Sequence, residues 1–244
     1  MLPRPRRRCG FNRVEAITCL AMSCIALCII GCGLSSSREA ANRISCTNNL
    51  RMLGIALHTY HDAQNRFPTE AGANPSFYKP LLPYLEQANA PDNAPIKEFL
   101  CPTRRNPAMA PGKRDYGYAA SNGAGTAGTS VLDSPDGVTL NSITSMNGTP
   151  QTLLLSHLWL DPQNYAGGDP TDLGWATKNN SRSFNNVAKP DGDATGSPQY
   201  LGGPHPNITP SLFADAHVAN MPYGFAQWAQ AWAWTNTKPI QGLP

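Results

Sequence analysis

The residues best suited to acid–base or metal chemistry stand near the C-terminal end of the chain. His205 is followed by Asp215 and His217, and imidazole and carboxylate groups are common zinc ligands. They would form one ligand set only if the chain folds back after His205. The competing interpretation is structural, with His205 hydrogen-bonded to a turn at Asp215. No serine or cysteine stands in a recognisable nucleophile motif, so we expect no catalytic residue and no enzyme.

Two acidic clusters could hold a hard cation. Asp169 to Asp172 and Asp191 to Asp193 each place carboxylates close together in segments of loop composition. Neither cluster has the spacing of a complete calcium-binding loop. We therefore expect no metal and no cofactor, with Ca²⁺ as the alternative.

The N-terminal segment carries a topology signal. Four arginines lie within residues 1–10, and residues 16–37 contain no charged residue. An uncharged run of roughly 20 residues spans a bilayer core of about 30 Å, and arginines before it keep the N-terminus in the cytoplasm. The chain has 19 Lys+Arg and 16 Asp+Glu, so 19 − 4 = 15 basic groups remain without these arginines. The positive charge therefore indicates topology, and we expect no nucleic-acid partner.

These features predict a single-pass inner-membrane protein with a cytoplasmic N-terminus and a periplasmic C-terminal domain. A second processing signal competes, because Ile29-Ile30-Gly31-Cys32 matches the four-residue pattern of a bacterial lipoprotein that is lipidated on the cysteine. Uncleaved anchoring is the third alternative. The sequence leaves this choice open.

The apolar run continues into a helix. Leu50, Leu53 and Leu57 form one stripe at helical spacing, and Gly54 beside them would allow close packing against a sheet. The helix should stop near Asn65. We therefore divide the chain into a leader (1–10), a membrane-spanning helix (11–34), its amphipathic continuation (35–65) and an extracytoplasmic β-rich domain (66–244).

The remainder of the chain is typical of short strands joined by long loops, because glycine and proline are abundant. Asp215-Ala216 has the position of a tight hairpin turn, and Leu81–Gln87 could be a short helix or turn on the main helix. The fold class we expect is α+β, with one long helix packed on an antiparallel sheet. The strands are predicted at residues 138–140, 152–160, 210–214 and 217–221.

Two cysteines, Cys46 and Cys101, lie outside the leader and the apolar run. In an extracytoplasmic domain a lone pair is more often a disulfide than two free thiols. The alternative is that the two residues are too distant to bridge.

The segment Gly10-Phe11-Asn12-Arg13-Val14-Glu15 resembles the signal of prepilins and pseudopilins. The resemblance implies cleavage after Gly10 by a prepilin peptidase, methylation of Phe11, and pairing of Glu15 with the new N-terminus of a neighbouring subunit. Asn12 and Arg13 depart from the usual Thr and Leu. A pilin-like fold and pilin-like subunits or a secretion machinery as partners are implied as well.

Further blocks resemble a large bacterial family of prepilin-like proteins of unknown function, abundant in planctomycetes. They are Arg38–Leu50 with its continuation to His61, Leu81–Gln87, Phe99–Pro102, Asn147–Leu154 and the final block from His205 to Val218. The final block matches a motif of a histidine, nine intervening residues and then Asp-Gly, with Ala216 in place of the glycine. Asn147 and His157 stand where the family usually has Asp and Glu. The sequence leaves open whether these departures abolish a function of the family.

The function expected from these features is that of a membrane-anchored, pseudopilin-like structural or assembly protein of the cell envelope. The alternative is a lipoprotein, lipidated at Cys32, whose external domain binds a solute or polysaccharide.

Overall fold

The computed structural model describes residues 12–70, 76–120, 130–177 and 188–244, and all of their side chains except those of residues 25–36. The chain divides into two compact units, residues 1–41 and 42–244. Helix α1 (Arg13–Gln64) runs through the boundary between them. The chain combines this helix with an antiparallel sheet, so the predicted α+β class is confirmed. In the described part of the chain, no helix has both the length and the apolar character required to cross a membrane.

Helix α1 is 52 residues long and ends at the predicted place. Asn65 follows in the left-handed region with φ 57°, a conformation that commonly terminates helices. Within the second unit, Leu50, Leu53 and Leu57 are fully buried, which confirms the predicted apolar stripe. Gly54 faces Leu212, so the close approach of helix and sheet expected from this glycine is also confirmed.

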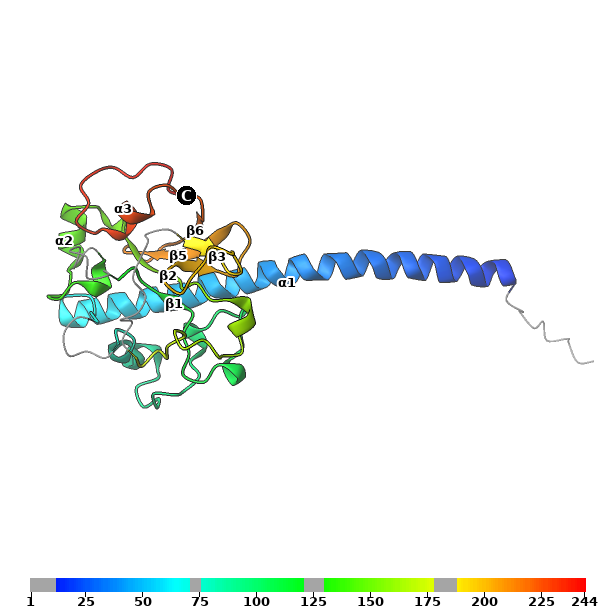
Figure 1. Ribbon diagram of the computed structural model, residues 1–244, viewed down its shortest axis with the longest axis horizontal. Coiled ribbons are helices and arrows are strands. Elements are labelled where there is room, and N and C mark those ends of the chain that lie inside the picture. The colour runs from blue at the N-terminus through cyan, green and yellow to red at the C-terminus, as the bar shows by residue number, and fades with distance from the viewer. Residues whose placement is uncertain (1–11, 71–75, 121–129, 178–187) are drawn as a thin grey trace, which may run out of the picture. The chain divides into compact units, whose positions relative to one another are not determined.

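The main sheet has four antiparallel strands in the order β1-β2-β5-β6 (Figure 1). Its strands are β1 (Tyr116–Gly117), β2 (Leu153–His157), β5 (Ile208–Phe213) and β6 (Val218–Pro222). Strand β2 is buried along its whole length, because it lies between β1 and β5 and shares one core with α1. A second sheet pairs two short parallel strands, β3 (Ala188–Pro190) and β4 (Leu201–Gly203).

The hairpin between β5 and β6 turns where the sequence predicts. The Phe213 amide donates to the His217 carbonyl over 2.9 Å, and Ala216 lies in the turn with φ 70°. An L-residue with a Cβ adopts this left-handed conformation at a cost. The strain expected from alanine in the glycine position is therefore present.

One predicted strand is wrong. Residues 138–140 do not form a strand; instead Leu140 begins the short helix α2 (Leu140–Ser145). The Thr139 hydroxyl accepts a hydrogen bond from the Ser142 amide, and such a cap favours a helix start over a strand. The loops predicted from composition also contain β1, β3 and β4, whose few residues leave no periodic pattern to detect.

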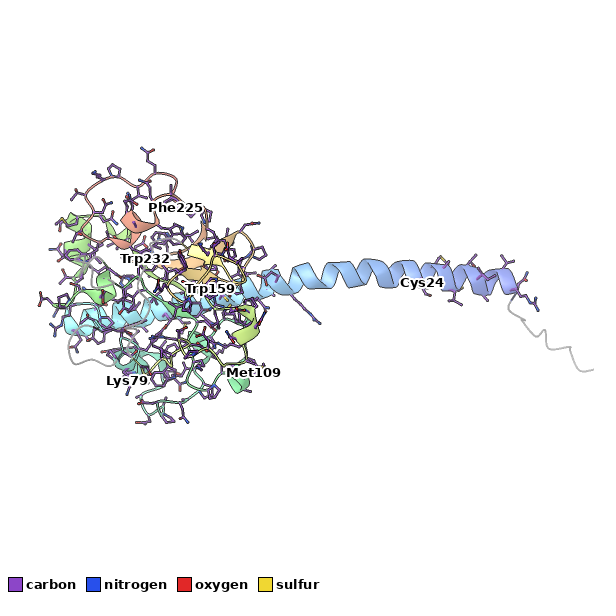
Figure 2. The ribbon with its side chains drawn as sticks, viewed as in Figure 1. Cys24, Lys79, Met109, Trp159, Phe225 and Trp232 are labelled. Carbon is purple, nitrogen blue, oxygen red and sulfur yellow. The ribbon has the colours of Figure 1, made fainter. Side chains whose placement is uncertain are left out.

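Short helices complete the second unit. Leu81–Gln87 overlaps a 3-10 helix, as one of the two predicted alternatives required, and α3 (Trp228–Trp232) packs against β2. Trp232 lies among the packed side chains of the second unit, and Trp228 is equally buried (Figure 2). The 3-10 helices are Lys79–Leu85, Lys97–Phe99, Pro107–Met109, Val131–Asp133, Thr149–Gln151 and Pro162–Asn164.

Candidate functional site

Four side chains from four separate segments meet in the interior of the second unit. Cys46 belongs to α1, Cys101 follows the 3-10 helix Lys97–Phe99, His157 ends β2, and His205 lies between β4 and β5. All four residues are 0% exposed. One sulfur or nitrogen atom from each lies within 4.8 Å of the corresponding atom of every other. We call these four residues the Cys/His cluster.

The contacts inside the cluster are close. The Sγ atoms of Cys46 and Cys101 lie 2.8 Å apart, and Cys101 Sγ lies 3.8 Å from His205 Nε2. The rings of His157 and His205 meet edge to face, with centroids 5.3 Å apart. The cysteines thus meet as the disulfide prediction requires, and the bond itself stays a prediction. Two thiols and two imidazoles in one place can also hold a metal ion.

Hydrogen bonds outside the cluster position its members. The Cys101 amide donates to Asp115 Oδ2 over 2.7 Å. His157 Nδ1 lies 3.1 Å from Thr209 Oγ1, and the Thr209 hydroxyl donates to the Gly202 carbonyl over 3.0 Å. Tyr223 holds the loop of His205 by donating its hydroxyl to the His205 carbonyl over 2.9 Å.

Burial controls the protonation of the cluster. Burial raises the pKa of the Cys101 thiol well above its usual value, and the hydrogen bond with Cys46 raises it further. Burial lowers the pKa of His157 well below its usual value, and the neighbouring charges of His205 and Arg104 lower it further. In the folded chain His157 is therefore a neutral imidazole.

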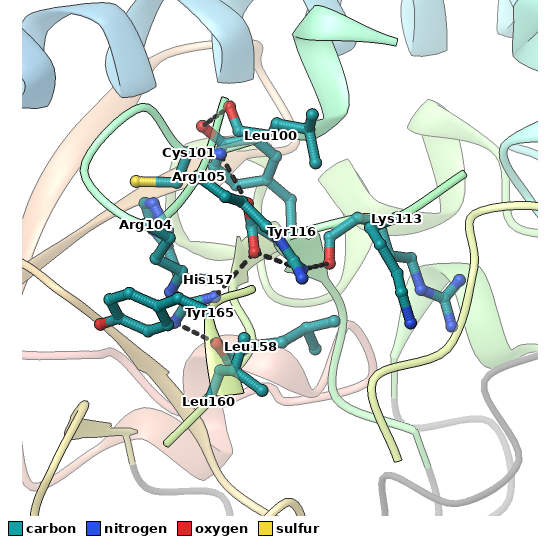
Figure 3. A network of polar contacts seen from close by, with 12 residues as sticks. Leu100, Cys101, Arg104, Arg105, Lys113, Tyr116, His157, Leu158, Leu160 and Tyr165 are labelled. Carbon is teal, nitrogen blue, oxygen red and sulfur yellow. Dashed lines mark hydrogen bonds and ion pairs between the residues drawn. The ribbon is translucent and has the colours of Figure 1, made fainter. Parts of the chain in front are cut away.

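A network of buried ion pairs lies beside the Cys/His cluster. Figure 3 shows Arg104 of this network close to Cys101 and His157 of the cluster. Arg104 Nε donates to Asp191 over 2.8 Å, and Arg105 donates to Asp115 over 2.7 Å and to Asp172 over 2.7 Å. These five side chains are at most 2% exposed. Every charge in the network faces an opposite charge, which is the condition under which buried charges are tolerated.

The acidic clusters considered for calcium are engaged otherwise. Asp172 and Asp191 bind the two arginines of this network, and Tyr165 also donates to Asp191 over 2.7 Å. Asp169 and Asp193 accept bonds from Thr171 and Thr195, which close small local turns. Across the described ranges, the Cys/His cluster is the group of three or more potential ligands that comes together.

His205 does not join Asp215 and His217, so the structure does not form the ligand set considered for these residues. Asp215 Oδ1 lies 2.5 Å from His217 Nδ1 on the hairpin turn, where both side chains are partly exposed. His205 is fully buried and contacts Cys101 and His157 instead. The suggested hydrogen bond from His205 to the Asp215 turn is also wrong, because Asp215 accepts its bonds from His217.

The structure describes only some of the residues that we predicted as N-terminal sites. Gly10 and Phe11 lie outside the described residues, and the side chain of Cys32 lies outside the described side chains. Glu15 stands in the first turn of α1, where its Oε2 accepts a hydrogen bond from the Asn12 amide over 3.1 Å. This bond satisfies one of the free amides at the helix start.

Asn147, one of the departures from the family pattern, has a structural role here. Its side-chain amide donates to Thr152 Oγ1 over 3.1 Å and to the Gln230 carbonyl over 3.4 Å, and its oxygen accepts from Asn236 over 3.0 Å. Asn147 therefore ties the entrance of β2 to the C-terminal segment.

The sequence does not reveal His157 as a member of the cluster, because the strand before it is mostly apolar and its polar neighbour Ser156 would point to the opposite face of a strand. Its position at the end of a fully buried strand is the one signal that could have found it. A buried histidine requires a polar partner, and the neighbouring Ser156 of β2 is bonded to Ser211 instead.

The second unit is thus an α+β domain in which a helix packs on an antiparallel sheet around a buried Cys/His cluster. The chain belongs to the family described as "Protein of unknown function (DUF1559)", whose model matches residues 35–237. Membership in a family of unknown function agrees with the motif blocks, whereas its prepilin-like character stays a prediction. Neither a curated protein nor a solved structure matches this chain.

Proposed function

We propose that this protein is a membrane-anchored, pseudopilin-like structural or assembly protein of the cell envelope, with no catalytic activity. The first part of α1 would be the anchor, and the second unit would face the periplasm. The observation that carries the proposal is the surface of α1 near its start. Val14, Ile17 and Leu20 are 64%, 67% and 68% exposed. Large apolar side chains in this number favour a lipid or protein environment over water.

The sequence supports the same anchor. The uncharged run continues through residues 25–36, and the arginines before it define the cytoplasmic side. In this arrangement the apolar helices of neighbouring pilin-like subunits, or of a secretion machinery, would cover the apolar side chains of α1.

Glu15 would contribute to assembly. Its carboxylate lies at the start of α1, one turn from the predicted cleavage site after Gly10. A carboxylate in an apolar environment is stabilised by a nearby cation, and the amine of a neighbour's new N-terminus would supply it.

The absence of catalysis is also part of the proposal. The Cys/His cluster is closed, with each of its four residues 0% exposed, so no substrate reaches it. The exposed Asp215 and His217 are bonded to each other on a hairpin turn. A structural role is the simplest one for both groups.

Mass spectrometry of the mature N-terminus from native membranes tests the anchor. We expect methylated Phe11, because prepilin peptidases cleave after the glycine and methylate the new terminus. A lipidated Cys32 would instead support the lipoprotein alternative, and an unprocessed Met1 would overturn both.

Crosslinking between chains in native membranes tests the assembly role. Glu15→Gln should abolish the higher crosslinked species, whereas Glu39→Gln, a matched change on the same helix, should preserve them. Equal crosslinking in the two variants would contradict a role of Glu15 in assembly.

A further inference from the structure

The structure assigns the Cys/His cluster to a tetrahedral metal site of the zinc class, with Cys46, Cys101, His157 and His205 as ligands. Two thiolates and two imidazoles are a ligand set that favours Zn²⁺ over hard cations such as Ca²⁺ and Mg²⁺. The four potential ligand atoms lie within 4.8 Å of one another, and all four residues are fully buried. The inference concerns the second unit and does not depend on how the N-terminal segment is processed.

His157 provides the strongest evidence for a ligand. The Thr209 hydroxyl uses its only proton on the Gly202 carbonyl, so its oxygen accepts from His157 Nδ1–H. The neutral ring then carries its free lone pair on Nε2, and this buried atom has no hydrogen-bond partner. An unpartnered buried nitrogen is costly, whereas a metal ion would use the lone pair. A hydrogen bond from the opposite ring nitrogen is the usual support of a metal-bound histidine.

The cysteines fit the charge of such an ion. When a dication binds, each thiol releases its proton to solvent, and two thiolates with two neutral imidazoles balance the double charge. The buried site then carries no net charge, as burial requires.

The distances among the ligands allow this arrangement. With Zn–S bonds of about 2.3 Å and Zn–N bonds of about 2.0–2.1 Å, the edges of the tetrahedron are roughly 3.3–3.8 Å. The contact of 3.8 Å between Cys101 Sγ and His205 Nε2 falls in this range. The 2.8 Å between the sulfurs lies between such an edge and a covalent S–S bond of about 2.05 Å.

The sulfur distance is nearer to a disulfide than to the edge of about 3.8 Å between two zinc-bound sulfurs, so a metal site requires the sulfurs to move apart, and the assignment rests on the histidines. A disulfide would consume both thiols and leave His157 Nε2 buried without a partner. A metal ion satisfies all four side chains at once. It would join α1, the segment after Phe99, the end of β2 and the loop before β5, so its role is to stabilise the fold. A closed site of four protein ligands leaves no position for a substrate.

Metal analysis of the full-length chain, purified from native membranes without chelator and without oxygen, tests the site. We expect one zinc ion per chain. The X-ray absorption spectrum of the zinc should show two sulfur and two nitrogen atoms bound to the ion. Replacement with Co²⁺ should produce the intense ultraviolet absorption of cobalt thiolates. Cys46→Ser and His157→Gln should each abolish stoichiometric zinc, whereas the matched changes Cys24→Ser and His217→Gln at exposed residues should retain it.

Thr209→Val tests the orientation of His157 without removing a ligand. We expect it to weaken zinc affinity by about 10–100-fold, the usual effect of losing a partner of a metal-bound histidine. If Cys46→Ser and His157→Gln fail to fold, the X-ray absorption spectrum and the cobalt spectrum of the unaltered chain test the metal site by themselves. Peptide mapping that finds Cys46 and Cys101 joined by a disulfide, a chain without metal, or zinc retained in both ligand variants would overturn the assignment.

Discussion

A Cβ atom placed on Gly54 of α1 would lie 2.9 Å from Cδ1 of Leu212 in the central strand β5. The helix therefore approaches the sheet as closely as a residue without a side chain permits. Leu50, Leu53 and Leu57 belong to the same core as Leu212. The contact sets the distance between α1 and the sheet, and hence the place of Cys46 in the interior.

Gly54→Val should destabilise the second unit by about 1–3 kcal/mol, because overpacking a close contact forces side chains or backbone to move. The free energy of unfolding from denaturant titration measures this. Gly224→Val is the control, because nothing lies within 4 Å of a Cβ at that position. Equal stability of the two variants would show that α1 does not pack closely at Gly54.

Ala216→Gly should stabilise the fold by about 1 kcal/mol, because it relieves a left-handed residue that carries a Cβ. Denaturant unfolding at neutral pH would detect the change. Ala219→Gly in the adjoining strand β6 should have the opposite sign, since glycine in a strand is unfavourable. A loss of stability in Ala216→Gly would contradict the strained turn.

Asp115→Asn should destabilise the fold by about 3–5 kcal/mol, because it removes the buried negative charge that two buried guanidinium groups share. Asp115 is fully buried and contacts both Arg104 and Arg105. Asp92→Asn, which breaks the exposed pair with Lys79, should cost at most about 1 kcal/mol. Thermal unfolding measures the loss of stability in both variants. A similar loss in Asp115→Asn and Asp92→Asn would contradict a stabilising role of the buried ion pairs.

Tyr118 should make the fold sensitive to alkali. Burial raises its pKa well above the usual 10.0, and its hydroxyl donates to Glu70 over 2.8 Å. The folded state holds this proton while the unfolded state releases it, so the stabilisation is complete below pH 10.0 and declines as pH rises above it.

Tyr118→Phe should therefore flatten the fall in stability above that pH, while lowering stability at neutral pH by about 1.5–3 kcal/mol through the lost bond to a carboxylate. Denaturant titrations from neutral to alkaline pH provide the measurement. Tyr84→Phe, at a half-buried position, serves as control. An unchanged slope in Tyr118→Phe would exclude the proposed linkage.

The elements predicted correctly from the sequence are those specified by neighbouring residues. The stripe of Leu50, Leu53 and Leu57 repeats at helical spacing, and Asp215-Ala216 separates two apolar runs at hairpin spacing. Residues 138–140 were assigned wrongly as a strand because three residues hold too little pattern to outweigh the cap at Thr139. Strands β1, β3 and β4 were not predicted for the same reason, because each has too few residues to show a periodic pattern.

By itself the sequence determined the long helix, the β5–β6 hairpin, the α+β class and the motif blocks of the family, because these depend on periodicity and on residues close in the chain. Only the tertiary structure decided which chemical groups meet. Cys46 and Cys101 are separated by 55 positions, and Cys101 and His205 by 104. No local pattern encodes such contacts, because they arise when apolar faces of distant segments pack and bring their few polar side chains together.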